Sequence, residues 1–457
     1  MTAAPDAPAT PPSAGSPFER VLRGSAFVAL GYGGSQALRL AANLVLTRLL
    51  FPEAFGIMAL VSVVLVGLAM VSDLGIGPSI MQHARGDDPA FLDTAWSIQI
   101  ARGGILWLAT LALAWPAAAF YDAPELRALL PAAGLTLLIA GFNPTRIETA
   151  GRHLMLGRVT LLDLASQVLG TASIIGLAWA MESVWALVLG AIVGALARLA
   201  LMHRFLPGPV NRPRWNPEAA RDILHFGKWI FLGTICGFVM GQQDKAILGR
   251  YLSLEGLGVY NIGYFLASFA VMLGGTVAGR VTIPLYRALA EAPTEATARR
   301  LRWLRAGLTG GVLAALAAAG VFGPALVGLL YDPRYAAAGA VVSALACAHI
   351  PHAIGMSYDQ AALAAGDSRR FFALLAVRAV AQTALFLIGV EVAGLAGALV
   401  GHASAHALTH PLLIGLARRY RVWDPVHDLG YALAGAAIAA GVIALHGPEL
   451  AALARFG

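Results

Sequence analysis

Long apolar segments separated by short polar ones dominate this chain. Each apolar segment runs for about 18 to 28 residues, which lets a helix cross the ~30 Å hydrocarbon core of a bilayer. Thirteen spans are predicted, in two sets of six and one more, at residues 25–46, 56–81, 93–120, 129–145, 160–181, 184–202, 227–247, 257–285, 303–330, 336–364, 371–392, 394–416 and 429–446. We therefore expect an all-α polytopic membrane protein, and we predict that it is not an enzyme because its short loops cannot form a catalytic domain.

One polar pattern, Leu-x-Arg-x-Leu-x-x-Glu-x-x-Gly, occurs twice, each time between two predicted helices. The copies are Leu46, Arg48, Leu50, Glu53 and Gly56, and then Leu248, Arg250, Leu252, Glu255 and Gly258. Each position recurs after 202 residues, which is nearly half of the 457 residues. This offset indicates two homologous bundles rather than a solenoid of small repeats. We expect two pseudosymmetric six-helix bundles that face each other across a cavity, as in transporters.

Polar segments set the predicted domain boundaries. Residues 1–17 are rich in Ala, Pro, Ser and Thr and predict a disordered cytoplasmic N-terminus without a cleaved signal peptide. The N-lobe then covers residues 18–202, and the Pro- and Arg-rich segment 203–226 predicts a cytoplasmic linker because it cannot continue a helix. The C-lobe covers residues 227–416. Residues 417–457 predict a basic cytoplasmic loop, one extra span and a short periplasmic tail.

Composition and charge agree with this topology. Hydrophobic residues make up 58% of the chain and charged residues only 12%, with a mean hydropathy of +0.71, which excludes a water-soluble domain of this length. About 19 of the 32 Lys and Arg fall on alternate loops. This bias places the N-terminus in the cytoplasm and accounts for the net charge of +7 without nucleic-acid binding. Cys236 and Cys347 both lie in predicted spans and form no disulfide framework.

Ionisable residues inside the spans are the candidate functional residues, because each charge at mid-bilayer costs about 2.5–3.5 kcal/mol on insertion scales. The basic ones are Arg39, Arg102, Arg198, Lys228, Lys245, Arg280, Arg305 and Arg378, and the acidic ones are Asp73, Asp163, Asp244 and Asp359. Arg198, Lys228 and Arg305 lie close enough to helix ends to reach the headgroups. The remaining excess of cations predicts a water-filled cavity for an anionic cargo.

Three histidines form a regular stripe in the twelfth predicted span. His402, His406 and His410 occupy i, i+4 and i+8 and share one helix face. The outer two lie about 12 Å apart, so all three cannot bind one ion. The stripe can be part of a metal site completed by His349 or His352, a proton sensor, or a hydrogen-bonded core or interfacial stripe. We favour the core or interfacial stripe and predict no metal and no cofactor.

Glycines mark two further features of the predicted helices. The run Asp-Leu-Gly-Ile-Gly-Pro that begins at Asp73 weakens its helix, and it predicts either a bending point or an ordinary helix end. The pairs Gly190 with Gly194 and Gly275 with Gly279 have helical spacing and predict close packing between helices.

The chain lacks a GxxxxGK[ST] phosphate loop, which excludes an ATP-driven pump acting by itself.

Several short motifs together resemble a known family. They are Phe55-Gly56-Ile57, Asp73-Leu74-Gly75-Ile76, Leu92-Asp93-Thr94-Ala95-Trp96, Phe120-Tyr121 with Pro124-Glu125-Leu126, and Asp244-Lys245 with Leu248-Gly249-Arg250. In the order and spacing of these motifs, residues 18–420 resemble the Wzx-type polysaccharide flippases. These form the polysaccharide transporter branch of the multidrug/oligosaccharidyl-lipid/polysaccharide (MOP) superfamily. The single span after the core departs from the family, where none or two are frequent.

The resemblance implies a two-lobe core, as in MATE transporters and related flippases, that works by alternating access. Its cargo would be undecaprenyl-pyrophosphate-linked oligosaccharide repeat units, which cross the bacterial inner membrane during exopolysaccharide, capsule or lipopolysaccharide O-antigen biosynthesis. The implied partners are this lipid-linked oligosaccharide, membrane lipids, and a polysaccharide polymerase with export machinery, but no nucleic acid. The main alternative is an ion-coupled multidrug antiporter like the MATE proteins, which needs carboxylates in its cavity. A non-transporting scaffold for polysaccharide assembly is a third.

A pyrophosphate needs fixed cations, preferably Arg forks that bind phosphate oxygens in pairs. We therefore expect Arg39, Lys245 and Arg280 to bind the pyrophosphate. Secondary contacts are assigned to Arg102, Arg378, Arg48 and Arg250. Ion-pairing or coupling roles are assigned to Asp73, Asp244 and Asp359.

Overall fold

The regular elements of the protein are helices throughout the part of the chain that the computed structural model describes, residues 17–153, 155–291 and 294–456. The first half contains α1 (Pro17–Leu49), α2 (Pro52–Val71), α3 (Ile76–Gln82), α4 (Pro89–Phe120), α5 (Leu126–Gly141), α6 (Arg146–Arg152), α7 (Leu156–Met181) and α8 (Trp185–Phe205). The second half contains α9 (Pro217–Tyr251), α10 (Leu254–Glu291), α11 (Glu295–Leu330), η1 (Pro333–Tyr335), α12 (Ala338–Ala348), α13 (Ile350–Gly355), α14 (Gln360–Ala364), α15 (Ser368–Arg419), α16 (Pro425–Ala452) and η2 (Leu453–Arg455).

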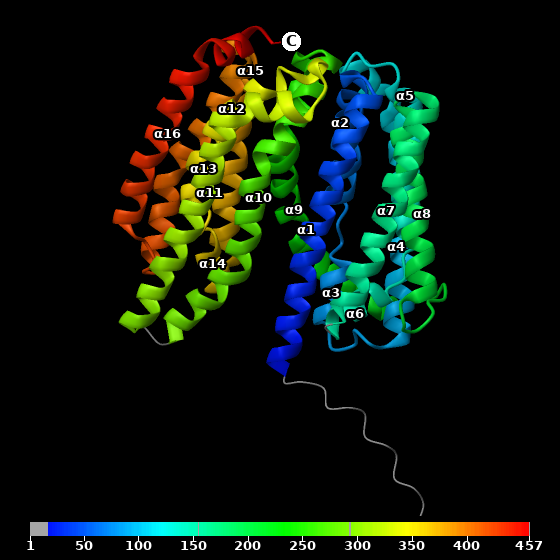
Figure 1. The fold of residues 1–457 in the computed structure, drawn as a ribbon. Helices are drawn as coiled ribbons and strands as arrows, with labels where there is room; N and C mark the ends of the chain where they lie inside the picture. The colour runs from blue at the N-terminus through cyan, green and yellow to red at the C-terminus, as the bar shows by residue number, and fades with distance from the viewer. Residues whose placement is uncertain (1–16, 154, 292–293, 457) are drawn as a thin grey trace, which may run out of the picture.

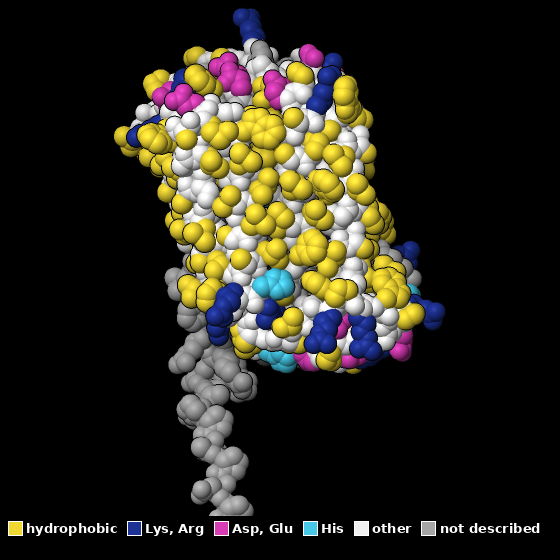
Figure 2. Space-filling model, turned by 90° about the vertical axis from the view of Figure 1, so that its right-hand side faces the viewer, with side chains coloured by type: hydrophobic (Ala, Val, Ile, Leu, Met, Phe, Trp, Pro, Cys, Tyr) yellow, Lys and Arg dark blue, Asp and Glu magenta, His cyan; other side chains and the backbone are white. Residues whose placement is uncertain are grey.

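The two halves form two helical bundles that stand side by side (Figure 1). Helices α1 to α8 form the N-lobe and α9 to α16 form the C-lobe, and α9 lies between the two bundles. The chain enters at one end of the molecule with α1 and finishes at the other end, beside η2. Apolar side chains cover the middle of the surface, and charged ones gather at its two ends (Figure 2). This distribution is that of a multi-pass membrane protein.

The number of helices suited to a membrane agrees with the predicted fold class. Nine helices among the described residues are long and apolar enough to cross a bilayer, and the bent pair α5 and α6, with 58° between them, makes ten. Helices α1 and α9, with 33 and 35 residues, are also long enough, but their charged and polar residues lower their hydropathy, and both fall outside this set. The all-α fold with two six-helix bundles and an additional C-terminal helix is confirmed.

The longest helix, α15, is a hairpin of two spans. Ala393 and Gly394 leave the helical conformation, with a φ of +54° at Gly394. The two arms then pack so closely that a Cβ on Gly389 would lie 2.0 Å from the carbonyl oxygen of Gly397. A Cβ on Gly401 would likewise meet the carbonyl oxygen of Leu385. The break falls at the residue that separates the predicted spans 371–392 and 394–416.

The two copies of the sequence repeat meet where α2 crosses α10. A Cβ on Gly56 would lie 1.9 Å from the carbonyl oxygen of Leu254, and a Cβ on Gly258 would lie 1.9 Å from that of Pro52. Pro52 and Leu254, like the two glycines, are 202 residues apart. The contact is therefore reciprocal, as expected at a pseudo-twofold axis between duplicated bundles. We call the end of the molecule that contains this crossing the closed end.

Further contacts hold the lobes together at the closed end. The hydroxyl of Tyr335 in the C-lobe donates to the carbonyl oxygen of Leu50, at 3.1 Å. The ring of Tyr335 also packs edge-on against Phe55 of the N-lobe, with 5.9 Å between centroids. Leu46, Leu50 and Leu257 belong to one apolar cluster here, which continues into both lobes.

Some predicted helices differ from the observed ones. The predicted span 336–364 is broken into α12, α13 and α14, because Pro351 cannot continue the hydrogen bonding of α12. The expected packing is observed at Gly194, which touches Gly170 of α7, but Gly275 and Gly279 have no neighbour within 4 Å. Those two glycines face open space, so the predicted close packing is wrong for them in this conformation.

The connection between the lobes lies along the N-lobe. Helix α8 continues to Phe205, and α9 begins at Pro217, capped by the side chain of Asn216. Between them the extended chain is bound to the N-lobe, with Asn211 hydrogen-bonded to Thr145 and the backbone N–H of Arg212 donating to Asp93. The first turns of α9 also pack on the N-lobe, and its C-terminal half contacts both α2 of the N-lobe and α15 of the C-lobe.

Candidate functional site

A cavity of about 690 Å³ lies between the two lobes. Helices of both lobes line it. The N-lobe and α9 contribute Arg39, Ala42, Asn43, Leu46, Thr171, Ile174, Met240, Gly241, Gln242 and Lys245. The C-lobe contributes Asn261, Tyr264, Phe265, Ser268, Phe269, Val271, Met272, His349, His352, Gln382, His402 and His406. We call this space the central cavity; its volume suits a ligand of several sugar-sized groups.

Two of the three residues predicted to bind pyrophosphate line the central cavity. The guanidinium of Arg39 lies 5.8 Å from the ring centre of Phe265, and the ammonium of Lys245 lies 4.6 Å from that of Tyr264. Among the described side chains, no carboxylate lies within salt-bridge distance of either cation. The charge of both groups is therefore available to a ligand in the cavity.

Much of the remaining lining of the central cavity consists of uncharged polar and aromatic side chains. Amide side chains of Asn43, Asn261 and Gln242 line it, and each can both donate and accept hydrogen bonds. Aromatic rings of Phe265 and Phe269 provide flat apolar faces beside them. Amides together with aromatic faces can hold the hydroxyls and the apolar faces of sugar rings.

The third predicted residue, Arg280, lies outside the lining of the central cavity. It is exposed on α10, eight residues beyond Met272, which is about 12 Å along the helix. Arg48 and Arg250 are also exposed, and they lie near the closed end. None of these three side chains reaches the cavity that contains Arg39 and Lys245.

Arg102 and Asp73 lie in a second, smaller cavity of about 420 Å³ within the N-lobe. Arg102 caps the C-terminus of α2 by donating to the hydroxyl of Ser72 at 3.0 Å and to the carbonyl oxygen of Ala69 at 2.5 Å. Asp73 accepts from the backbone N–H of Gly75 at 2.9 Å, which stabilises the turn between α2 and α3. Both residues shape the end of α2 rather than the central cavity.

The remaining predicted acids have partners inside the protein. Asp359 pairs with Arg378 of α15, with 2.6 Å between oxygen and nitrogen, so its partner is none of the three predicted cations. Asp244 accepts from the hydroxyl of Tyr260 at 2.8 Å and does not line the central cavity. Asp163 pairs with Arg198 at 2.7 Å. Pairing of this kind offsets the cost of burying each charge.

One wall of the central cavity consists of histidines. The ring of His402 lies 5.1 Å from that of His406 and 5.2 Å from that of His349, and His352 packs edge-on against His406 at 4.6 Å. The predicted stripe on α15 is therefore joined by two histidines from the broken span. No group of His, Cys, Asp or Glu in the described part of the chain has the geometry of a metal site.

Sequence reasoning did not identify the uncharged lining residues of the cavity. Asn261, Tyr264 and Ser268 recur every three or four residues along α10, but the same spacing also occurs on the buried faces of helices. The signal for Gln242 was the polar run that it shares with Gln243 and Asp244 in an otherwise apolar span.

Curated relatives match this chain over about half of their own length. The teichuronic acid biosynthesis protein TuaB of Bacillus subtilis (strain 168) is 22% identical over 223 residues, which are 48% of this chain and 45% of that protein. The succinoglycan biosynthesis transport protein ExoT of Rhizobium meliloti (strain 1021) is 23% identical over 251 residues, or 54% and 50%. The lipopolysaccharide biosynthesis protein WzxC of Escherichia coli (strain K12) is 22% identical over 275 residues, or 59% and 54%.

Solved structures share the fold. A multidrug resistance MATE family transporter of the MOP superfamily, in an inward-facing conformation, has a TM-score of 0.61 at 16% identity and covers 88% of this chain and 95% of its own. The lipid II flippase MurJ, in an inward closed conformation, has a TM-score of 0.61 at 11% identity and covers 90% of both chains. A family model described as polysaccharide biosynthesis protein matches residues 45–336, which is more than half of the sequence. This chain therefore belongs to the polysaccharide biosynthesis protein family.

Proposed function

We propose that this protein is a flippase that moves undecaprenyl-pyrophosphate-linked oligosaccharides across the bacterial inner membrane by alternating access. The observation that carries the proposal is the charge of the central cavity. Arg39 lines it from α1 and Lys245 lines it from α9, and no carboxylate lines it among the described residues. Surplus cations at the interface of two lobes suit an anionic cargo that both lobes must bind and then release.

The lining matches the separate parts of such a cargo. The pyrophosphate would bind Arg39 and Lys245, since charged hydrogen bonds to phosphate each contribute about 1.5–3 kcal/mol. The sugars would lie against the amides of Asn43, Asn261 and Gln242 and the rings of α10. The lipid tail would stay in the bilayer, because the cavity lining offers no long apolar channel for it. Arg280 would meet the cargo on its way along α10.

The orientation follows from the arrangement of basic loops. With the N-terminus in the cytoplasm, the closed end lies on the periplasmic side, and the end where α1 begins lies on the cytoplasmic side. In this conformation the lobes meet at the periplasmic end. Cargo would enter from the cytoplasm, and separation of α2 from α10 would release it.

The alternative of a multidrug antiporter rests on the shared fold with MATE transporters. A cavity that selects cationic drugs needs carboxylates. The carboxylate next to Lys245 in the sequence, that of Asp244, accepts a hydrogen bond from Tyr260 instead of lining the cavity. The cavity charge therefore favours the anionic cargo. A scaffold without transport activity would have no need for two unpaired cations at the lobe interface.

The test is translocation of a fluorescent polyprenyl-pyrophosphate-linked oligosaccharide in proteoliposomes. We expect Arg39→Ala and Lys245→Ala each to lower the translocation rate at limiting probe at least tenfold, since each removes one charged contact. Arg48→Ala is the matched control, because it removes the same side chain from the same helix but outside the cavity. Full activity of both cavity variants, or efflux of a cationic dye instead of the probe, would reject the proposal.

A further inference from the structure

The two arms of α15 touch near their bend but separate toward the other end of the molecule. Near the bend, a Cβ on Gly389 would lie 2.0 Å from the carbonyl oxygen of Gly397. Gly415, further along the second arm, has no neighbour within 4 Å of such a Cβ. It borders a groove of about 330 Å³ whose lining residues all belong to the two arms. We call this space the hairpin groove.

The broken span holds the two arms apart on the inner side of the hairpin. Leu374 of the first arm and Leu413 of the second belong to one buried apolar cluster with Tyr358, which follows α13. The inner side of the gap is therefore filled by protein. On the outer side, Val377 and Leu412 are exposed, and both line the hairpin groove. In a multi-pass membrane protein, such an apolar groove faces the acyl chains of the bilayer.

Two arginines stand at the polar end of the hairpin groove. Arg370 lies in the first turn of the first arm, and Arg419 is the last residue of the second. Asp367 pairs with Arg370 and also accepts from the hydroxyl of Tyr420 at 2.8 Å, so the guanidinium of Arg370 is held in place. Among the described side chains, no carboxylate lies within salt-bridge distance of Arg419. The groove therefore ends in a positive charge that is free to bind a ligand.

The dimensions of the hairpin groove match one leaflet of a bilayer. From Arg419 to Leu412 it follows seven residues of helix, which is about 10 Å. Half of the hydrocarbon core measures about 15 Å. An acyl chain can therefore lie along the groove while its phosphate stays at the membrane boundary. Arginine forks bind phosphate oxygens in pairs, and basic pockets between helices at this boundary bind anionic headgroups.

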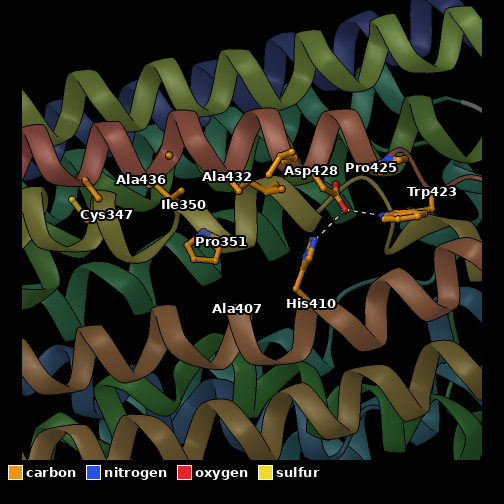
Figure 3. A pocket seen from close by; sticks show the side chains of 14 residues that line it. Cys347, Ile350, Pro351, Ala407, His410, Trp423, Pro425, Asp428, Ala432 and Ala436 are labelled. Atoms are coloured by element: carbon orange, nitrogen blue, oxygen red, sulfur yellow. Dashed lines mark hydrogen bonds and ion pairs between the residues drawn. The ribbon is translucent and has the colours of Figure 1, made fainter.

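A second groove, of about 580 Å³, lies on the opposite face of the second arm, between α13, α15 and α16 (Figure 3). Its polar end is the carboxylate of Asp428, which lies 3.2 Å from the Nε2 of His410 and accepts from the indole N–H of Trp423 at 2.9 Å. No arginine or lysine lines this groove among the described residues. A negative charge repels an anionic headgroup, so only the hairpin groove of these two suits a phosphate.

Orientation of the chain in the membrane does not by itself explain the two groove arginines. The positive-inside rule accounts for basic residues at this end, and it covers Arg369 and Arg418, the exposed neighbours of the groove pair. It does not require two arginines from different arms at the end of one apolar groove. It also does not require that Asp367 hold one of them in place. Both features are those of a ligand site.

We propose that the hairpin groove binds an anionic phospholipid of the bilayer. The phosphate lies between Arg370 and Arg419, and one acyl chain lies along the apolar floor of the groove. In the orientation proposed above, this lipid belongs to the cytoplasmic leaflet, but the site itself rests on the geometry of α15 and not on flippase activity. Gln382 of the first arm and His402 of the second both line the central cavity. The lipid therefore stabilises the spacing of two arms that form part of the cavity wall.

The experiment measures lipid binding to the full chain purified in detergent. Native mass spectrometry follows the lipids retained as dioleoyl phosphatidylglycerol or dioleoyl phosphatidylcholine is added; their chains are the same, and only the first carries a net negative charge. We expect phosphatidylglycerol to bind one site at least tenfold more tightly and to raise the melting temperature, because a ligand of the folded state stabilises it. Glycerol phosphate, which lacks the chains, should bind at least tenfold more weakly than phosphatidylglycerol.

Two variants separate the charge of the site from its groove. Arg370→Ala combined with Arg419→Ala should lower phosphatidylglycerol binding at least tenfold, since both charged contacts to the phosphate are lost. Gly415→Phe should lower it as strongly although both arginines remain, because the ring would fill the open space beside Gly415. The matched control is Arg299→Ala combined with Arg300→Ala, two exposed arginines of α11 that line neither groove. Melting without added lipid checks that all variants fold.

Selective binding of phosphatidylglycerol that both groove variants lose and the control variant keeps supports the site. Equal binding of the two phospholipids, an equal loss in the control variant, or unchanged binding in Gly415→Phe overturns it. Displacement of phosphatidylglycerol by polyprenyl pyrophosphate would assign the groove to the cargo and overturns it as well. None of these measurements requires translocation, so the flippase can fail while this site stands, and the site can fail while the flippase stands.

Discussion

A methyl group at the crossing of α2 and α10 should shift the balance between conformations of the lobes. In Gly56→Ala the new Cβ would lie 1.9 Å from the carbonyl oxygen of Leu254. That atom belongs to a helix backbone and cannot rotate away, so the two helices must separate by at least about 1 Å to restore ordinary contact. The substitution therefore destabilises the conformation in which the two lobes meet at the closed end.

The size of this effect can be worked out from the contact. Overpacking of this kind costs about 1–3 kcal/mol. Since 1.4 kcal/mol is a factor of ten, the ratio of open to closed conformations at this end should rise about 5- to 150-fold. The gain in helix propensity from Gly to Ala applies to both conformations and cancels from this ratio.

The assay is a distance measurement between spin labels at Glu53→Cys and Glu255→Cys, two exposed and symmetry-related positions at the closed end, with Cys236 and Cys347 replaced. We expect longer distances in Gly56→Ala. Gly279→Ala is the control, since Gly279 lies on the partner helix α10 with no neighbour within 4 Å. An unchanged distance distribution in Gly56→Ala would refute the reasoning that this crossing sets the closed conformation.

Three further predictions concern stability and the closed end. Tyr335→Phe removes the hydrogen bond to Leu50 and should weaken the closed end by about 0.5–1.5 kcal/mol, seen as longer distances between the same spin labels; unchanged distances would contradict this. Gly394→Ala should lower the free energy of unfolding by about 1–3 kcal/mol, because φ is +54° there, whereas Gly415→Ala, inside the helix with no neighbour within 4 Å, should not lower it in the same melting assay. Bonds from the backbone and side chain of Arg370 and from Tyr420 lower the pKa of Asp367 to about 2. Because a lowered pKa stabilises the fold above the unfolded value near 4 and this contribution disappears toward pH 2, the melting-temperature deficit of Asp367→Asn should shrink between pH 4 and pH 2; a constant deficit would exclude the charge as its cause.

The length of the apolar segments was sufficient to predict the helices but not the places where they are interrupted. The break at Ala393 and Gly394 coincides with the predicted boundary between the spans 371–392 and 394–416. The breaks between α12, α13 and α14 were missed, because residues 336–364 form one apolar run and a Pro in a membrane helix is often tolerated. Length and apolarity therefore predict how many helices form better than where they bend.

The candidate site could be predicted only in part, because charge partners depend on how helices are rotated against each other. Arg39 and Lys245 were predicted from their depth in the spans, and they line the central cavity. The pairing of Asp359, in the turn before α14, with Arg378 of α15 has no signal in one sequence. The four-histidine wall also needs the rotation of α13 toward α15, although the stripe on α15 itself was visible.

The attachment of α9 to both lobes constrains how the protein can move. Its first turns are fixed to the N-lobe through Ala219, Ala220 and Ile223, and its C-terminal half packs on α2 of the N-lobe while it is hydrogen-bonded to the C-lobe through Gln243 and Asp244. A change of angle between the lobes must then either bend this uninterrupted helix or separate it from one of its two neighbours. Either event costs free energy, so α9 would oppose excursions from the resting geometry and help to return the lobes after the cargo has left.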